Sequence, residues 1–311
     1  MVLTLTANPA LDHTVTVEKL ELGGTNRVSL SHAAVGGKGI NVSRALRQLG
    51  VASAATGFLA GPEGRRVEES VAEQGIRPDF IWLKEGSTRV NVKIYEASEN
   101  RTTELNNPGP IVGQEEAHAL LDRLDSLLPQ VDFLVCAGSL PQGLPSSFYA
   151  AVIEKARVYG VKACLDTSGA ALAEGVCAKP YLVKPNKDEA EQLLGYPIVG
   201  LQAVRTAVRD LAELGIPVVV LSLGGEGAVF YRTGEDIVWG RAQAEPLRST
   251  TGCGDSLLAG TVAAIKAGLS WEETVRFAVA TATAAAELFG TEFPSKTHIE
   301  GVLHRVQVQR F

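Results

Sequence analysis

The stretch Ser249-Thr250-Thr251-Gly252-Cys253-Gly254-Asp255-Ser256 decides how the rest of this 311-residue chain is interpreted. Apolar residues recur at i, i+3, i+4 and i+7 from position 257 to 265, which predicts a helix that begins near Asp255. Glycines just before a helix let unpaired backbone N–H groups converge on an anion, which the helix dipole also favours. Because a carboxylate would repel a phosphate held there permanently, the pattern indicates a phosphoryl group in transit. Asp255 is then the base that accepts the proton of the attacking hydroxyl.

Asp255 also has a simpler interpretation. Aspartate is a favoured N-cap, so Gly-x-Gly-Asp before a helix is also typical of an ordinary capped helix after a glycine turn. The remaining sequence has to decide between a catalytic and a structural aspartate.

The composition is that of a globular protein with a substantial core. Apolar residues make up 45% and charged residues 21% of the chain, and the length suits one large α/β domain or two domains. The formal net charge of −6, with no run of lysine or arginine, disfavours nucleic acid or an acidic membrane surface as a partner. An acidic small substrate would therefore need a local basic cluster.

Cysteine usage and the N-terminus favour a reduced, cytoplasmic protein. The four cysteines show no Cys-x-x-Cys spacing, and two lie in predicted core strands. Residues 1–6 lack the basic and long apolar regions of a signal peptide, and no stretch is apolar enough to span a bilayer. The five histidines have no ligand-like spacing, so a histidine metal site is not expected.

Strands alternate with helices along most of the chain, which predicts an α/β fold. Near-continuous apolar runs predict core strands at 2–6, 52–59, 131–137, 161–166, 181–184 and 217–222. Helices are predicted at 40–49, 63–74, 114–128, 146–159, 187–194 and 201–214; after two short strands, the remainder from Asp255 is predicted to be helical, with an amphipathic helix at 298–306. These elements predict a mostly parallel central sheet with helices on both faces.

Two segments of alternating pattern, about 11–33 and 86–107, predict a small β-sheet beside the ends of the core strands. In residues 88–95, valine and isoleucine alternate with arginine, asparagine and lysine, as in a strand with one solvated face. We expect residues 1–311 to form a single α/β domain in which this sheet is a lid or a dimer contact.

In an open α/β sheet, ligands bind beyond the carboxyl ends of the strands. Polar and small residues gather at those predicted places: Asp12, Gly36–Asn41, Gly138-Ser139, Asp166, Asn186 and Ser222–Gly227. Each alone would fit a turn, because Gly, Asn, Asp and Ser dominate turns. Their shared place at the strand ends favours a ligand site.

Two common nucleotide-binding motifs do not occur in the sequence. Gly-x-x-x-x-Gly-Lys-Ser/Thr fails because Gly37-Lys38 is followed by Gly39 and the required earlier glycine is His32. Gly-x-Gly-x-x-Gly does not open the first βα unit, since Gly39 is followed by Ile-Asn-Val. A P-loop enzyme and a dinucleotide dehydrogenase are both disfavoured.

Paired motifs near the two ends carry a family resemblance. Gly36–Val42 and Thr250–Ser256 resemble the two signatures of the ribokinase-like carbohydrate kinases of the phosphofructokinase B type. The similarity runs nearly end to end, with further matches at Asn8–Asp12, Thr88–Ile94, Gly138–Pro141, Lys184–Glu189 and Ser222–Gly224. Within that family, the Thr-Arg-Val-Asn-Val-Lys-Ile strand most resembles the branch that acts on phosphorylated ketohexoses. That branch includes 1-phosphofructokinase, tagatose-6-phosphate kinase and a minor 6-phosphofructokinase.

The resemblance implies which residues handle the acceptor. Asp255 would deprotonate the sugar hydroxyl, and the N–H groups of Gly252, Cys253 and Gly254 would stabilise the transferring phosphoryl group. Lys38 and Arg89 would bind the phosphate already on the substrate, although a solvated strand face is the simpler interpretation of Arg89. The implied substrate-binding residues are Asp12, Gly37, Lys38, Asn41, Arg89 and Ser139, together with Arg27, which could reach across a dimer.

ATP and Mg²⁺ are the cofactors that the resemblance implies, and dependence on a monovalent cation stays open. Asn186 and Glu189 resemble the family's Asn-x-x-Glu element for magnesium and phosphate, and they also fit a helix capping box. The implied nucleotide contacts are Lys184, Asn186, Ser222, Gly224, Gly225, Glu226, Gly227 and Gly254.

Position 253 departs from the family's pattern, because it is cysteine where relatives usually carry alanine or serine. Its contribution to the anion pocket would come from the backbone. A thiol at a helix N-terminus has a lowered pKa, which predicts oxidant sensitivity, whereas a small packed residue is the simpler interpretation.

We therefore expect ATP-dependent phosphorylation of fructose 1-phosphate to fructose 1,6-bisphosphate. Tagatose 6-phosphate and fructose 6-phosphate stay open as acceptors, and the expected protein partner is a second copy bound through the lid. A sugar-phosphate sensor without catalysis is the alternative from another class, which the intact Asp255 and the Asn186–Glu189 pair disfavour. A dehydrogenase is disfavoured by the missing dinucleotide loop.

Overall fold

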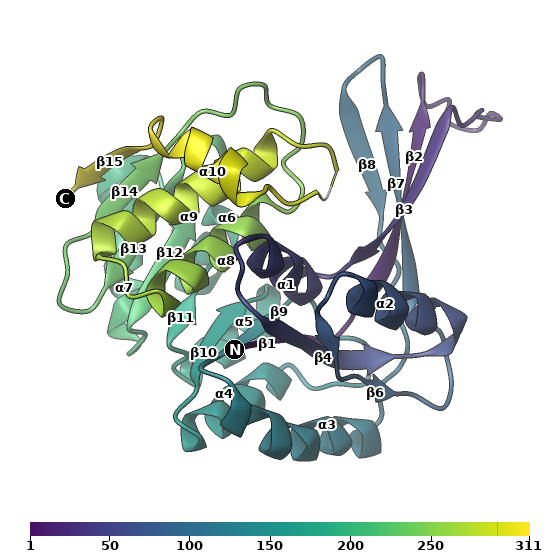
Figure 1. Cartoon of the computed structure of the whole chain (residues 1–311), viewed down its shortest axis with the longest axis horizontal. Coiled ribbons are helices and arrows are strands. Elements are labelled where there is room, and N and C mark those ends of the chain that lie inside the picture. Colours follow the sequence, from purple (N-terminus) through teal and green to yellow (C-terminus); the bar gives the residue numbers. More distant parts are fainter. Residues whose placement is uncertain (291) are drawn as a thin grey trace.

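The computed structural model describes residues 1–290 and 292–311, and it consists of a large central sheet, helices packed on both sides of it, and a second sheet that projects from one end (Figure 1). The predicted α/β class is confirmed. Within the described residues, no helix combines the length and apolarity that a bilayer crossing needs.

The middle of the central sheet is parallel. Its strands run in the order β12-β11-β10-β9-β1-β4-β5, and every neighbouring pair is parallel. Their carboxyl ends therefore share one edge, where ligands bind in such sheets. The bounds are β1 Val2–Thr6, β4 Ser53–Leu59, β5 Arg77–Pro78, β6 Ile81–Trp82 (paired with β4), β9 Phe133–Ala137, β10 Lys162–Asp166, β11 Leu182–Val183 and β12 Val218–Ser222.

An antiparallel edge completes the sheet beyond β12 with β13 (Ala228–Arg232), β14 (Val238–Arg241) and β15 (Gln307–Arg310). The prediction that the chain stays helical to position 306 is wrong. Helix α10 (Lys296–Leu303) ends earlier, and the chain then pairs with β14. Pairing with an open sheet edge offers the backbone hydrogen bonds that local sequence pattern does not reveal.

Two apolar clusters cover the two faces of the sheet, because successive side chains of a strand point to opposite faces. One face carries α1 (Lys38–Gln48), α8 (Cys253–Lys266), α9 (Trp271–Ala286) and α10. The other carries α3 (Gln114–Leu127), which continues as the short 3₁₀ turn η1 (Leu128–Gln130), α4 (Phe148–Val158), α5 (Gly169–Cys177), α6 (Lys187–Leu194) and α7 (Gly200–Glu213). Helix α5 had no predicted counterpart.

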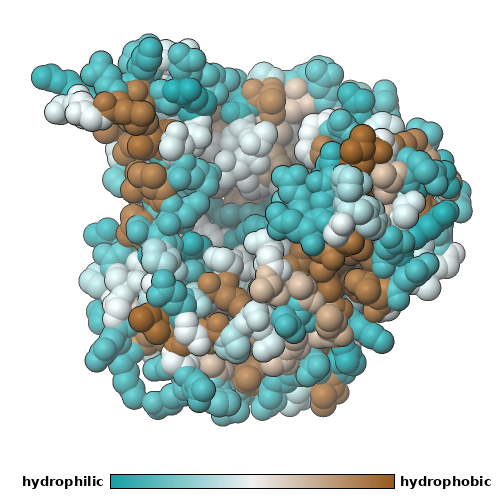
Figure 2. Space-filling view, turned by 180° about the vertical axis from the view of Figure 1, so that it is seen from behind, coloured by the Kyte–Doolittle hydropathy of each residue, from teal (hydrophilic) through white to brown (hydrophobic). Residues whose placement is uncertain are grey.

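The second sheet, called the lid from here on, corresponds to the small β-sheet predicted from the sequence. It has the strand order β3-β2-β7-β8, with bounds β2 Ala10–Val17, β3 Leu30–Gly36, β7 Arg89–Glu96 and β8 Arg101–Leu105. Its base packs on α2 (Gly61–Glu73) through Leu11, Val35 and Val90. Figure 2 shows a hollow between the projecting lid and the main body, with mostly hydrophilic and pale residues in it.

The polar face of β7 is not the solvated face that the sequence predicts. Asn91 is 6% exposed, and the Lys93 side chain is 11% exposed. Both contact Asp12 on the neighbouring strand. The alternation correctly separates the two faces of β7. The polar face, however, contacts Asp12, and the apolar face with Val92 and Ile94 is half-exposed. A polar site at this position reverses the usual hydrophobic-in pattern.

Candidate active site

The start of α8 has the geometry of an anion pocket. Gly252 is its N-cap and adopts a left-handed conformation with φ 80°, which other residues rarely adopt. In the first turn, the N–H groups of Gly254 and Asp255 have no preceding turn to bond and are available to an anion in front of the helix, while Cys253 N makes a long 3.4 Å contact with Thr250 O. A Cβ at Gly254 would lie 3.4 Å from Nζ of Lys184, which places this cation beside the same turn.

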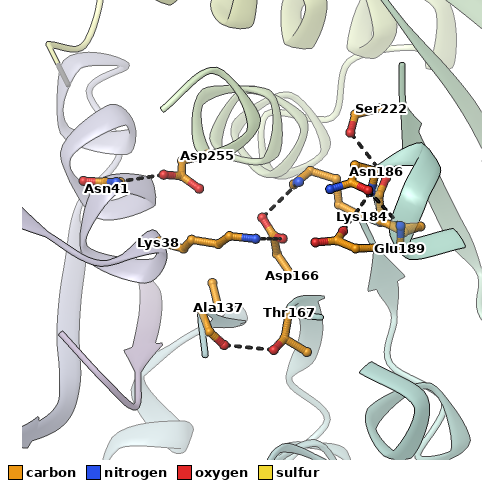
Figure 3. Close-up of polar contacts among 12 residues, drawn as sticks. Lys38, Asn41, Ala137, Asp166, Thr167, Lys184, Asn186, Glu189, Ser222 and Asp255 are labelled. Atoms are coloured by element: carbon orange, nitrogen blue, oxygen red, sulfur yellow. Dashed lines mark hydrogen bonds and ion pairs between the residues drawn. The ribbon is translucent and has the colours of Figure 1, made fainter. Parts of the chain in front are cut away.

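Asp255 lies in that first turn and is 7% exposed. Its Oδ2 accepts a 2.8 Å hydrogen bond from Nδ2 of Asn41, which projects from α1 (Figure 3). Burial and the nearby Asp166 carboxylate raise the pKa of Asp255 to about 6, while Asn41 and the lysines Lys38 and Lys184 oppose that rise. The carboxylate is therefore mostly ionised at neutral pH and close to the pKa that suits a general base.

Asp166 joins the two halves of the site. This buried carboxylate, at the end of β10, pairs through Oδ1 with Lys38 Nζ at 3.0 Å and through Oδ2 with Lys184 Nζ at 3.0 Å. Figure 3 shows Lys38 reaching it from the left and Lys184 from the upper right, with Asp255 above the Lys38 side chain. Burial tends to raise the pKa of Asp166, but the two ammonium groups outweigh burial and hold it below its ordinary value.

Sequence reasoning placed Asp166 at a strand end without giving it a role. A signal for that role was present in the sequence. Asp166 ends a buried strand, and the motifs place Lys38 and Lys184 at the same carboxyl edge of the sheet, where they can pair with it. Lys38 has a raised pKa for the matching reason: burial lowers it, but Asp166, Glu189 and Asp255 raise it by more. The pair thus stays charged in the folded protein.

The acceptor side of the site is formed by the base of the lid. Asp12 Oδ1 accepts a 3.0 Å hydrogen bond from Asn91 Nδ2, and Oδ2 pairs with Lys93 Nζ at 2.9 Å. The Arg89 guanidinium lies on the same face of β7 and donates to the carbonyl oxygens of Asn8 (2.9 Å from Nη2) and Asn107 (3.2 Å from Nη1). Asn91 and Lys93 were missed as site residues, because alternation alone could not separate a solvated face from a ligand face.

Gly37 directly precedes Lys38, and a Cβ at Gly138, the residue before Ser139, would lie 3.9 Å from the Lys38 Cβ. A Cβ at Gly37, which has φ 116°, would stand 2.8 Å from Cγ2 of Thr6, so the loop passes close to β1. Ser139 follows Gly138, whose N–H donates to Asp166 O and whose carbonyl accepts from Thr167 Oγ1 at 2.9 Å. These two hydrogen bonds hold the loop after β9 against the end of β10.

Arg27 is not brought to this group within one chain. The β2–β3 hairpin pairs Ala10 with Gly36 at the base of the lid and Thr16 with Leu30 at its far end. Arg27 precedes Leu30 and is exposed in the hairpin loop, several residue spacings from the Arg89 side chain at the base. Within one chain, Arg27 therefore does not line the acceptor side.

The expected nucleotide residues follow β11 and β12. Asn186 caps α6: its Oδ1 accepts from Glu189 N at 2.8 Å, and Glu189 Oε2 accepts from Asn186 N at 2.8 Å. The capping box is thus present, while the Glu189 carboxylate still points toward Lys38 and Asp166 (Figure 3). Beyond Ser222, the 3₁₀ turn η2 (Gly224–Glu226) leaves open space where side chains of Gly224 and Gly225 would be. Gly227 closes the turn toward β13.

These residues fit a hydrated magnesium ion. In the described part of the chain, no three His, Cys, Asp or Glu side chains converge as a complete metal cage. Mg²⁺ keeps most of its waters and needs only one or two carboxylates besides phosphate oxygens. Glu189 supplies such a carboxylate beside Asn186, whereas both oxygens of Asp166 are already paired with lysines.

A comparison with protein families identifies the family of this chain. The family model described as pfkB family carbohydrate kinase matches residues 6–298. The chain belongs to the PfkB family of carbohydrate kinases. The resemblance inferred from the paired glycine motifs is confirmed, and a sugar kinase is the enzyme class.

Named relatives of this PfkB kinase act on sugar phosphates. The chain is 37% identical over 307 residues to a 1-phosphofructokinase of Rhodobacter capsulatus, covering 98% of this chain and 96% of that protein. It is 34% identical over 277 residues to a tagatose-6-phosphate kinase of Staphylococcus epidermidis, covering 88% of this chain and 87% of the relative. The expected activity and one of its two open alternatives, tagatose-6-phosphate kinase, are thus both represented among these relatives.

Solved structures agree in fold over the whole length. A Thermotoga maritima protein, described as a possible 1-phosphofructokinase, has a TM-score of 0.91 and 30% identity, covering 100% of this chain and 99% of its own. Escherichia coli phosphofructokinase-2 in complex with substrates and products has a TM-score of 0.90 and 27% identity, covering 97% and 98%. The E. coli enzyme has also been solved with potassium and in a tetrameric inhibited form.

Cys253 does not have the lowered pKa that its place at a helix start predicts. Burial and the neighbouring Asp255 carboxylate raise the pKa of its thiol to about 11. Its Sγ lies 3.6 Å from the carbonyl oxygen of Ser249. In this PfkB kinase the desolvation of the thiol outweighs the helix dipole, so the simpler interpretation, a small packed residue, fits the geometry.

Proposed function

We propose that this PfkB kinase transfers the γ-phosphoryl group of ATP to fructose 1-phosphate and forms fructose 1,6-bisphosphate. The observation that carries the proposal is a cation beside each hydroxyl-binding group: Arg89 lies near Asp12, and Lys38 lies near Asp255, which accepts a hydrogen bond from Asn41. Two cations beside two hydroxyl-binding groups suit an acceptor that is both a sugar and a phosphate dianion. The 1-phosphofructokinase relatives support the same acceptor.

Asp255 and the start of α8 supply the chemistry. The acceptor hydroxyl oxygen attacks the γ-phosphorus, the bond from phosphorus to the β–γ bridging oxygen breaks, and ADP leaves. The hydroxyl proton passes to the Asp255 carboxylate. Amides of Gly252, Cys253 and Gly254 stabilise the charge on the moving group, each by ~3–4 kcal/mol on the scale of an oxyanion-hole donor. Because the transition state is loose, a base with a pKa of about 6 is strong enough.

ATP and Mg²⁺ are assigned to the Lys184 side of Asp166, opposite the acceptor residues on the Lys38 side. Lys184 would contact the donor phosphates, and Ser222 with the open turn Gly224–Gly227 would border them and the ribose. Mg²⁺ would bind through Glu189 beside Asn186 and neutralise phosphate charge. A monovalent cation near the nucleotide is a further proposal, supported by the potassium complex of the E. coli enzyme.

The lid is proposed to be a homodimer contact of a single-domain kinase that works in the cytoplasm. Val15, Val92, Ile94 and Leu105 share one face of the lid sheet, and Leu105 is 54% exposed. A second lid packed on this face would cover it and could bring Arg27 to the partner's acceptor site. Light scattering should give a dimer for the wild type and a monomer for Val92→Lys. A dimer for both proteins would contradict the proposed dimer contact.

An acceptor panel tests the assignment. Initial rates with fructose 1-phosphate, tagatose 6-phosphate, fructose 6-phosphate, fructose and ribose should be highest for fructose 1-phosphate and poor for both free sugars. Highest kcat/KM with tagatose 6-phosphate would move the enzyme to the other branch. Fast turnover of ribose would contradict the role of Lys38 and Arg89. Tight binding of fructose 1-phosphate without ATP-dependent product would favour the sensor.

A further inference from the structure

Lys93 is a largely buried cation at the acceptor side that the reaction described above does not use. It projects from β7, and its side chain is 11% exposed. Its Nζ lies 2.9 Å from Asp12 Oδ2 and 4.0 Å from Glu104 Oε1, whose side chain is 43% exposed. Lysine is rarely this buried unless it is paired, so the Asp12 contact explains its position.

Asp12 is clamped on both carboxylate oxygens by the same strand. Asn91 Nδ2 occupies a lone pair of Oδ1 at 3.0 Å, and Lys93 occupies one of Oδ2. Asn91 is itself fixed, because its Oδ1 accepts from the backbone N–H of Asn107 at 3.1 Å. A carboxylate has about four acceptor directions, so two remain for sugar hydroxyls, and the clamp sets where they point.

The charge of Asp12 conflicts with the phosphate of the proposed substrate. A carboxylate suits sugar hydroxyls, but it repels a dianion that must lie in the same small site. Arg89 and Arg44 face Asp12 from a longer range, and both guanidinium groups also donate to backbone carbonyl oxygens. Lys93 alone of these cations is in direct contact with the Asp12 carboxylate in the described structure.

We propose that Lys93 enables this kinase to bind a phosphorylated acceptor by neutralising Asp12, so that one site can hold sugar hydroxyls and a phosphate dianion together. This inference rests on the proposed phosphorylated acceptor. Lys93 acts through Asp12 as a positioning and charge-balancing residue, and it does not take part in phosphoryl transfer.

The test compares Lys93→Met, Lys93→Arg, Asp12→Asn and the double variant Lys93→Met/Asp12→Asn. Methionine keeps the length of the side chain and removes its charge, whereas arginine keeps the charge. Lys84→Met is the matched control, because Lys84 is 79% exposed and pairs with the exposed Glu115 at 3.7 Å. The readouts are KM for fructose 1-phosphate, KM for ATP, kcat and the thermal midpoint of each variant.

We expect Lys93→Met to raise the KM for fructose 1-phosphate at least tenfold while the KM for ATP stays within about twofold. Lys93→Arg should stay within about threefold of wild type, as should Lys84→Met. In the double variant, the KM should fall back to within about threefold of that of Asp12→Asn, because no unbalanced carboxylate remains. Such non-additivity is the signature of direct coupling.

An unchanged KM in Lys93→Met would overturn the proposal. Additive effects in the double variant, or equal losses for ATP and the acceptor, would also overturn it, because they would show a general structural role. The proposed function fails separately, if wild-type enzyme gives no product with fructose 1-phosphate in the acceptor panel.

Discussion

Asn41 Nδ2 and Asp255 Oδ2 are joined by a 2.8 Å hydrogen bond between the first turns of α1 and α8, although the residues are 214 positions apart in sequence. The bond ties the two glycine-containing motifs of the chain to each other. One motif brings the acceptor-binding amide and the other brings the base, so packing of these helices sets the distance between base and acceptor. The same bond stabilises the ionised form of Asp255.

The pKa of Asp255 predicts the acid limb of activity. A base works only when deprotonated, so kcat/KM for the acceptor should fall below a pH of about 6 and be level above it. Asn41→Leu removes a hydrogen bond that lowers this pKa, so its acid limb should move to higher pH. Rates from pH 5 to pH 9 measure the acid limbs of wild type and of Asn41→Leu. An acid limb at the same pH in both enzymes would contradict the role of Asp255 as the base.

Asp166→Asn should destabilise the protein as well as slow it. The substitution leaves Lys184, whose side chain is 5% exposed, without its counter-charge. Breaking a buried ion pair in this way costs about 3–5 kcal/mol. Urea unfolding should show this loss, and Lys184→Met in the same chain should restore part of the stability but none of the activity. Equal stability of Asp166→Asn and wild type would mean that the pair is not formed in solution.

Glu287 should make the stability of the kinase acid-sensitive. This residue, 8% exposed, accepts from the N–H of Glu245 at 2.9 Å and pairs with Arg305 and His298, each at 2.7 Å. Burial tends to raise its pKa, but these three contacts outweigh burial and hold the pKa below the ordinary 4.5. A depressed carboxyl pKa stabilises the fold above the unfolded value and loses that effect as pH falls through the folded value.

Glu287→Gln should therefore lower the free energy of unfolding by about 2 kcal/mol at pH 7, the scale of hydrogen bonds to a charged group. The gap between variant and wild type should narrow once the pH falls below about 4.5. Denaturant titrations at pH 4 and pH 7 would measure this difference in the free energy of unfolding. A gap of the same size at both values would mean that the charge of Glu287 is not what stabilises the fold.

Cys253 should not make the enzyme sensitive to oxidants. Its thiol has a pKa raised to about 11, so little thiolate is present at neutral pH. Inactivation by millimolar peroxide should proceed at the same rate in wild type and in Cys253→Ala. Protection by the alanine would show that the thiol ionises more easily than its half-buried position implies.

Sequence pattern was sufficient for the core of the fold. Buried strands such as β12, with three consecutive valines, and helix starts marked by glycine or Asn186 have local signals. The strand β15 and the helix α5 lacked them, because pairing with an existing sheet edge or packing on α4 decides them. Tertiary context overrides local preference in such segments.

The site divides in the same way. Asp255 and Asn41 were identified because motif glycines mark them, and their contact follows from the packing of two helices. Asp166, Asn91 and Lys93 gave weaker signals, because their meaning lies in partners from other strands. The pKa of Cys253 was predicted with the wrong sign, since sequence shows the helix dipole but does not show burial.

The most direct test of the account is the rate of phosphoryl transfer from ATP to fructose 1-phosphate by Asp255→Asn. The variant should lose at least about a thousandfold in kcat, within the range for removal of a general base and its charge. Its stability at pH 8 should equal or exceed that of wild type, because a buried carboxylate with a raised pKa costs stability when ionised. Turnover close to wild type by a folded Asp255→Asn enzyme would contradict the account.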